Sequence, residues 1–482
     1  MTARRRRPEE AGPLTSAGQR ELWLAHQLAP DSTALNLVLA VRVRGELAAA
    51  PLARALTGLV VRHELLRSRF VTGADGLPVR ELRPVHAFAP DERRVEISGG
   101  DDEVDAGLFA RAHRAGQEPL DPAAEVFRLI VLRHGEQDAV LVAVAHHLVS
   151  DATSQCLVIR DLLDGYQAER TGRPAADRSR PAPWDAYVRA ERACAGSARG
   201  ERAREHWRRV CTGVPPAALP GGRSREAGGG AGGATLRLSL PADTAERLDA
   251  VSAAAGVTAF AWLFAAFQGS LYRSGGAPRS LIGLPATTRR TPRDREAVGY
   301  YVNTLPVAGE FDDSTSFRSA ARAVHGQLAE GMRHLGAPVE LPDGAGPLRV
   351  IVTLISADRL PIPGLFGEGG EGHGGHEGHG GHEGHKGPAG TERSGLRLSL
   401  YDVPQQEGQS ELAVEIVRSG SGFTAMFRYE TALFDRAAIE GFAGVLLRLV
   451  EASLDDPGIR ISRVPLAAPD ELAFLLSLGE AW

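Results

Sequence analysis

One stretch limits the possible folds of this chain more than any other: FRLIVLRHGEQDAVLVAVAHH, which runs from Phe127 to His147. Two runs of apolar and β-branched residues flank the polar turn GEQD, a pattern typical of a β-hairpin. The second run, DAVLVAVA, is apolar on both faces of the strand that it would form, as expected of a short strand inside a sheet. The chain is therefore expected to fold around a sheet that contains this hairpin.

Strand and helix patterns alternate along the rest of the chain. Residues 34–45, ALNLVLAVRVRG, show the period-two alternation of a strand, and residues 51–70 show the period of an amphipathic helix with a proline in its first turn. Strand and helix patterns resume in the second half with TLRLSL, TAFAWLFAAFQGSLYR and SLIGLPATT. The predicted fold class is therefore α/β, an α+β sandwich, in two lobes.

A proline- and arginine-rich break at residues 171–183, TGRPAADRSRPAP, separates the predicted lobes. We assign residues 13–175 to an N-terminal lobe and residues 184–482 to a C-terminal lobe. Residues 1–12 are charged and are expected to form a disordered tail. Residues 367–390 consist mainly of glycine, histidine and glutamate, so they are expected to form a disordered insertion.

The composition excludes several classes of protein. Hydrophobic residues at 43%, charged residues at 24% and a net charge of −5 are typical of a soluble globular protein. No basic stripe alternates with aromatic residues, so nucleic acid is not expected as a partner. No apolar run has the length of a membrane span, and no secretory signal pattern follows the basic start. Three cysteines without framework or metal-ligand spacing fit a reducing cytoplasm, where we expect the protein: Cys156, Cys194 and Cys211.

The hairpin ends in HHLVSDA, which places His146 and His147 at a strand end and Asp151 four residues after the second histidine. Successive side chains of a strand point to opposite faces, so the two imidazoles are not expected to ligate one metal ion. Ser150 or Asp151 is expected to cap the helix that follows. On these residues alone two interpretations stay open: a satisfied core histidine before a helix cap, or a reactive site beyond a strand end, where ligand sites of α/β sheets lie.

The HHLVSDA segment resembles the motif of two histidines, three residues, an aspartate and a glycine in the condensation domains of non-ribosomal peptide synthetases, which are akin to chloramphenicol acetyltransferase. Four further segments resemble other motifs of that family, in the family's order: residues 14–36, 62–70, 298–306 and 429–466. The resemblance covers nearly the whole chain. It implies two acetyltransferase-like lobes in a V arrangement, with the active site at their junction.

The resemblance also implies an acyltransferase without an intrinsic cofactor. Such a protein joins a carrier-bound acyl or aminoacyl thioester to an amine, or less often to an alcohol, in natural-product and antibiotic biosynthesis. The donor arrives on the phosphopantetheine arm of a carrier protein that is met in trans. The acceptor is a small molecule or is itself carrier-bound, and the chain is expected to be a monomer. The main alternative is a catalytically inactive docking protein that recruits a partner enzyme to a carrier-bound peptide; an epimerase-type relative and an acyl-CoA transferase are the others.

The same resemblance suggests roles for individual residues. His147 is the expected catalytic residue, because a neutral imidazole can take the acceptor's proton or hold the nucleophile by a hydrogen bond. His146 is expected to support His147 from the buried side, and Asp151 to pair with Arg62 or Arg67 of the second motif. The substrate channel is expected to include Ala152, Tyr301 and Asn303.

Two features depart from the family's pattern. Ala152 stands where the family has glycine, and if that position needs φ > 0, alanine costs about 1 kcal/mol and shifts the loop. The insertion carries five histidines at a spacing of three, whose imidazoles suit Zn²⁺ or Ni²⁺ but have no fixed geometry. We expect only incidental metal binding by these histidines, and no metal in the active site: His373, His376, His379, His382 and His385.

Overall fold

The computed structural model describes residues 13–173, 178–219, 221–223, 232–341, 346–362, 364–365, 391–393, 395–403, 410–420 and 422–466. The predicted tail at residues 1–12 and the predicted insertion at residues 367–390 lie outside the described residues. The chain forms two compact units. The first unit comprises residues 1–194, 287–302 and 356–406, and the second comprises residues 195–286, 303–355 and 407–482.

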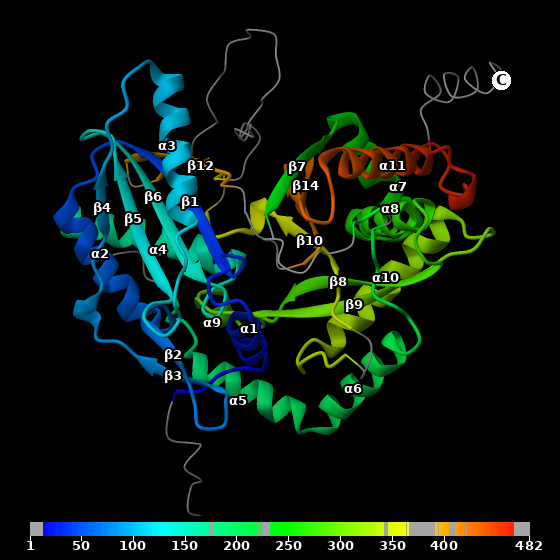
Figure 1. The fold of residues 1–482 in the computed structure, drawn as a ribbon, viewed down its shortest axis with the longest axis horizontal. Coiled ribbons are helices and arrows are strands. Elements are labelled where there is room, and N and C mark those ends of the chain that lie inside the picture. Colours follow the sequence, from blue (N-terminus) through cyan, green and yellow to red (C-terminus); the bar gives the residue numbers. More distant parts are fainter. Residues whose placement is uncertain are drawn as a thin grey trace, which may run out of the picture. The chain divides into compact units, whose positions relative to one another are not determined.

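The first unit is built on a six-stranded sheet of order β11-β12-β1-β6-β5-β4 (Figure 1). All neighbouring strands are antiparallel except β4 and β5, which are parallel. The strands, in sheet order, are β11 (Thr391–Arg393), β12 (Leu396–Tyr401), β1 (Asn36–Arg44), β6 (Asp138–His146), β5 (Phe127–Arg133) and β4 (Asp91–Arg94). The predicted hairpin is therefore confirmed, as β5 and β6.

Helices cover both faces of this sheet. Leu141 of β6 belongs to the core that the sheet shares with α2 (Ala49–Arg62) and α4 (Ala152–Thr171). Val140 and Val142, which point the other way, pack in the core that includes α3 (Asp101–Gly116). Every residue of β6 after Asp138 is buried, so the prediction of an interior strand is confirmed.

The remaining elements of the first unit are helices and a small second sheet. They are α1 (Ala17–Leu28), α5 (Trp184–Ala195), α9 (Pro292–Arg295), and the antiparallel pair β2 (Ser68–Thr72) and β3 (Pro78–Leu82). The predicted helix at residues 51–70 was too long, because α2 ends at Arg62 and β2 begins at Ser68. Ser68 and Phe70 are both buried, so the chain has already changed to the alternation of a strand there.

The division of the chain differs from the predicted lobes at residues 13–175 and 184–482. Residues 287–302 and 356–406 belong to the first unit rather than to a continuous C-terminal lobe. The reason is strand pairing: β12 pairs with β1 along its length, from Ala40 opposite Tyr401 to Arg44 opposite Arg397. Nothing in the pattern of β12 itself tells which sheet it joins.

The second unit has its own six-stranded sheet, of order β7-β14-β13-β10-β8-β9. Its strands are β7 (Gly233–Leu240), β14 (Gly422–Glu430), β13 (Leu412–Ser419), β10 (Val350–Ser356), β8 (Arg279–Thr287) and β9 (Val302–Glu310). One large core joins this sheet to its helices, which are α6 (Ala198–Cys211), α7 (Ala242–Ala255), α8 (Ala259–Arg273), α10 (Phe317–His334) and α11 (Arg436–Asp455). The α/β class with two sheet-and-helix lobes is thus confirmed.

No single helix among the described residues is both long enough and apolar enough to cross a membrane, although the bent pair α7 and α8 passes the same test by length and composition.

Candidate active site

The two histidines lie at the junction between β6 and α4. His146 is the last residue of β6 and lies opposite Asn36 of β1. The backbone N–H of His147 donates to the carbonyl of Leu35 at 2.8 Å, so the chain is still anchored to β1 one residue beyond the strand. Helix α4 then begins at Ala152, with Asp151 as its N-cap. The strand, turn and helix therefore present these polar residues together.

The ring of His147 is held in one tautomer. Its Nδ1 lies 2.7 Å from the carbonyl oxygen of Ser150. A carbonyl oxygen can only accept, so Nδ1 carries the proton and Nε2 keeps its lone pair. Burial lowers the pKa of His147 below its usual value, so the imidazole is neutral near pH 7. The ring of Tyr300 meets this imidazole at right angles, with the centroids 5.0 Å apart.

His146 is more deeply buried and has the opposite tautomer. It is 2% exposed, and its Nδ1 accepts the backbone N–H of Leu148 at 3.2 Å, which places the proton on Nε2. Its Nε2 has no hydrogen-bond partner among the described residues, and the ring meets His26 at 5.3 Å in a T-shaped contact. His146 thus holds the turn that carries His147. Burial lowers the pKa of His146 to about 3.

Because His146 is buried and neutral, we expect the folded protein to lose stability in acid. Between its unfolded pKa near 6.5 and its folded pKa of about 3, the unfolded chain binds a proton that the folded chain does not. Stability therefore falls as pH drops below 6.5, by about 2 kcal/mol at a pH of about 5. We expect His146→Gln to lose less stability than wild type between a pH of about 7.5 and about 5, measured as the free energy of unfolding in urea. An unchanged pH dependence in the variant would contradict this interpretation.

Asp151 is buried and pairs with Arg289, not with Arg62 or Arg67. Nη1 of Arg289 donates to Oδ2 of Asp151 at 2.9 Å, and Nη2 donates to Oδ1 at 3.1 Å. The predicted pairing is wrong because both candidates have other partners. Arg62 pairs with Asp161 of α4 at 3.0 Å, and Arg67 donates to the carbonyl of Arg83.

The carboxylate of Asp151 also holds two backbone groups. Oδ1 accepts the N–H of Ser154 at 2.7 Å, so the predicted helix cap is confirmed. Oδ2 accepts the N–H of Tyr301 at 3.1 Å. The hydroxyl of Ser154 donates to the carbonyl of Gly299 at 2.9 Å, accepts the Gly299 N–H at 3.0 Å and accepts Nη2 of Arg289 at 2.7 Å. Asp151 and its neighbours therefore fix residues 299–301 against the start of α4.

Tyr301 lies in the interior of the first unit. Its side chain is fully buried, with the guanidinium of Arg289 4.2 Å from its ring centroid and Trp184 packed on it at 5.1 Å. The residue beside it, Tyr300, is the one whose ring contacts His147. A role of Tyr301 at the substrate channel remains a prediction; its contacts in this structure support the Asp151–Arg289 pair.

The other two predicted channel residues lie in regular secondary structure: Ala152 in α4 and Asn303 in β9. Ala152 is exposed and is the first residue of α4, where a helical φ suits alanine, so the expected strain is absent. Asn303 belongs to the second unit and donates from Nδ2 to the carbonyls of Leu335 and Ala337, at 3.3 and 2.8 Å. Their effects on a substrate channel remain predictions.

Sequence reasoning missed three residues of this site. Gln19 of α1 donates to the carbonyl of Leu148 at 2.7 Å and accepts the indole N–H of Trp184 at 3.0 Å. Tyr300 packs so close to α1 that a Cβ on Gly18 would lie 2.5 Å from its ring. Arg289 is the third. It is a polar residue just beyond the end of β8, as His147 is just beyond the end of β6, so the same sequence signal could have found it.

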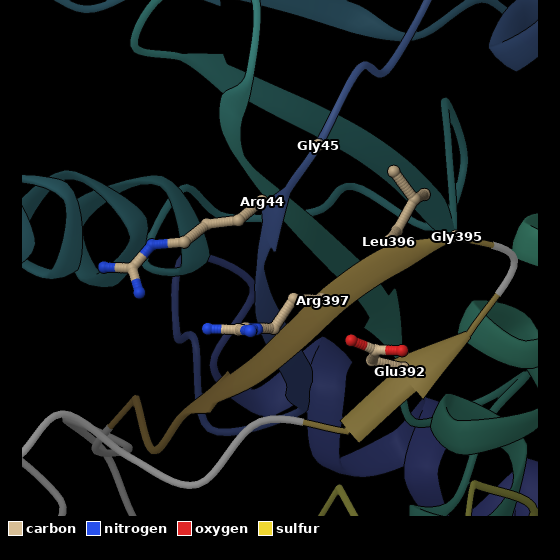
Figure 2. Close-up of a pocket in the computed structure, with 6 residues that line it drawn as sticks. All are labelled: Arg44, Gly45, Glu392, Gly395, Leu396 and Arg397. Carbon is tan, nitrogen blue, oxygen red and sulfur yellow. The ribbon is translucent and has the colours of Figure 1, made fainter.

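Figure 2 shows a pocket of about 350 Å³ on the first unit, lined by Arg44, Gly45, Glu392, Gly395, Leu396 and Arg397. In the pairing of β1 with β6, Arg44 lies opposite Asp138, whereas Asn36 lies opposite His146. The pocket is therefore at the other end of β1 from the histidines, and it is separate from the candidate active site. The five histidines of the predicted insertion lie outside the described residues.

Comparison with known proteins identifies the family. The model of the condensation domain matches residues 9–341, so this chain belongs to the condensation domain family, as the resemblance predicted. It is 27% identical over 477 residues to a linear gramicidin synthase of Brevibacillus parabrevis; the match covers 98% of this chain but only 6% of that protein. The chain therefore spans a small part of this much longer relative.

Solved structures agree on the fold. The first condensation domain of the calcium-dependent antibiotic synthetase, in complex with a substrate analogue, superimposes with a TM-score of 0.73 at 21% identity, over 94% of this chain and 99% of that one. The X-domain from teicoplanin biosynthesis superimposes with a TM-score of 0.76 at 22% identity, over 94% and 97%. At these identities the likeness shows the fold alone.

Proposed function

We propose that this chain is an acyltransferase that joins a carrier-bound acyl or aminoacyl thioester to an amine, or less often to an alcohol. The observation that carries the proposal is the state of His147. Its Nδ1–H is held by the Ser150 carbonyl, which leaves the lone pair on Nε2, and burial lowers the pKa of the ring so that it is neutral near pH 7. A neutral imidazole with a fixed tautomer is what a general base requires.

In the proposed reaction the acceptor nitrogen attacks the thioester carbonyl carbon. The C–N bond forms, the C–S bond breaks, and the thiol of the phosphopantetheine arm leaves with a proton. Nε2 of His147 takes the proton that the acceptor loses and returns it to the leaving sulfur. General-base catalysis contributes about 10²–10⁴-fold, and holding the two substrates together contributes up to about 7–11 kcal/mol. An alcohol acceptor depends on the base more than an amine does, because it is the weaker nucleophile.

The remaining residues of the site are proposed as positioning residues. Asp151 and Arg289 fix residues 299–301, and Tyr300 then packs on the ring of His147. His146 and Gln19 hold the turn through the N–H and the carbonyl of Leu148. This arrangement limits the motion of an imidazole that lies beyond the end of its strand.

We place the docking alternative second, because no contact among the described residues favours it over the acyltransferase. Ala152, which stands where the family has glycine, is the first residue of α4, where alanine causes no backbone strain, so this departure gives no support to an inactive protein. The likeness to the X-domain shows the fold alone.

The test mixes the protein with a donor acyl group loaded on a carrier protein and a panel of amines and alcohols. Intact-mass spectrometry follows acyl loss from the carrier and product formation. Formation of an amide or ester that requires the protein supports the proposal, and the panel identifies the acceptor class. Binding of the loaded carrier without turnover of any acceptor would favour the docking alternative.

A further inference from the structure

A second cluster of polar side chains lies in the second unit, outside the candidate active site. His206 of α6 meets Glu330 and His334 of α10, and the possible ligand atoms of these three residues all lie within 4.8 Å of one another. Glu330 and His334 are four residues apart on one helix, which places them on the same face. Among the described residues no other group of three such side chains comes together in this way.

One pair of the cluster already has about the spacing that a tetrahedral metal ion needs. Nitrogen and oxygen ligands lie about 2.0–2.2 Å from Zn²⁺, so two of them are about 3.3–3.5 Å apart. Nε2 of His334 and Oε1 of Glu330 are already 3.1 Å apart. The imidazoles of His206 and His334 are stacked, 4.4 Å apart between centroids and 17° from parallel, so both rings would have to turn to bind one ion.

The two helices that carry the cluster are packed closely behind it. The ring of Trp207 meets His206 at 4.5 Å and His334 at 6.3 Å. A Cβ on Gly331 would lie 3.1 Å from Trp207, so this glycine allows the indole to approach α10. The backbone on both sides of the cluster is therefore held in place, so only the side chains need to adjust around a cation.

Solvent reaches the cluster from the side of Glu330. The side chain of Glu330 is 40% exposed, and that of His334 is 16% exposed. Arg333 also pairs with Glu330, through the other carboxylate oxygen, but its side chain is 71% exposed and can turn into solvent when a cation arrives. Oε1, which faces His334, does not depend on that pair.

We propose that His206, Glu330 and His334 bind one divalent transition-metal ion, such as Zn²⁺, with the fourth position open to water. Two imidazoles and one carboxylate suit Zn²⁺ and neighbouring transition metals, whereas Mg²⁺ and Ca²⁺ prefer oxygen ligands throughout. The ion joins α6 to α10 and so stabilises the second unit. This inference does not rest on the proposed acyltransferase function, because none of its ligands belongs to that site.

The test must separate this site from the histidines of the insertion. The parent protein is therefore the full chain with five substitutions to asparagine: His373→Asn, His376→Asn, His379→Asn, His382→Asn and His385→Asn. Titration calorimetry measures the affinity of the protein for Zn²⁺. Thermal unfolding with and without Zn²⁺ measures how far the ion raises the unfolding temperature. Titration with Co²⁺ reports the geometry through its visible absorption.

We expect the parent to bind one Zn²⁺ and to unfold at a higher temperature in its presence. His206→Ala and, as a milder change at an exposed position, Glu330→Gln should each weaken binding at least tenfold and remove the thermal shift. His325→Ala, on the same helix but outside the cluster, is the matched control and should bind as the parent does. The proposal is overturned if the parent binds no Zn²⁺, or if His206→Ala and Glu330→Gln bind Zn²⁺ as tightly as the parent does. It is also overturned if bound Co²⁺ lacks the intense visible absorption of an ion with four ligands.

Discussion

Replacement of His147 by alanine is expected to lower the rate of product formation by about 10²–10⁴-fold, the usual contribution of a general base. The loss should be larger with an alcohol acceptor than with an amine. His147 contributes a hydrogen bond to the carbonyl of Ser150 as well as the lone pair of Nε2, so folding must be checked by thermal unfolding of the same sample. The rate is measured by intact-mass spectrometry of the loaded carrier.

His134→Ala is the matched control. His134 lies at the other end of the β5–β6 hairpin, and its Nδ1 also meets a backbone carbonyl, that of Val95, at 3.2 Å. Its loss should leave the rate unchanged. A rate for His147→Ala equal to that of wild type would mean that positioning alone carries the reaction.

The pH dependence gives an independent check on the same residue. Only neutral imidazole can act as a base, and burial lowers the pKa of His147. The acid limb of kcat/KM should therefore lie below pH ~6.5, the usual histidine value, and the rate should be lost as pH falls through the lowered pKa. The limb should be absent from the residual activity of His147→Ala.

Removal of either partner of the Asp151–Arg289 pair is expected to destabilise the protein by about 3–5 kcal/mol, because the other charge is left buried. Their side chains are 7% and 4% exposed. Asp151→Asn and Arg289→Met are the single variants, and urea denaturation gives their free energies of unfolding. The double variant should cost less than the sum of the two, since it removes the uncompensated charge.

Arg69→Met is the matched control for this pair. Arg69 and Glu81 form an ion pair on the first unit whose side chains are 48% and 43% exposed. Its loss should cost less than about 1 kcal/mol, the usual range for an exposed pair. If the double variant lost as much free energy of unfolding as the two single variants together, Asp151 and Arg289 would not act as a pair.

Local patterns predicted the elements around the site well. The interior strand β6 could be predicted because its side chains are apolar on both faces, and the cap at Asp151 because a polar residue follows a strand end and precedes a helical pattern. Both signals are carried by a few neighbouring residues. They place His147 between a strand end and a helix start, whereas the class of the fold was predicted from the alternation of strand and helix patterns along the chain.

Partners far apart in the sequence could not be predicted in this way. Arg289 lies 138 residues from Asp151 in the sequence, and the many arginines of the chain offer no local sign of which one is near. The resemblance suggested Arg62 or Arg67, but Arg62 pairs with Asp161 and Arg67 donates to the carbonyl of Arg83. Likewise nothing within residues 396–401 shows that β12 joins β1.

The pairing of β12 with β1 has a consequence for how the chain is made. A ribosome releases β1 early, but its partner at residues 396–401 emerges only after strands β7 to β10 of the second unit. Until then one edge of β1 presents unpaired backbone groups, which is the arrangement that favours association between nascent chains. The first unit therefore completes its sheet late in synthesis, and a fragment that stops at Cys194 would keep that edge open.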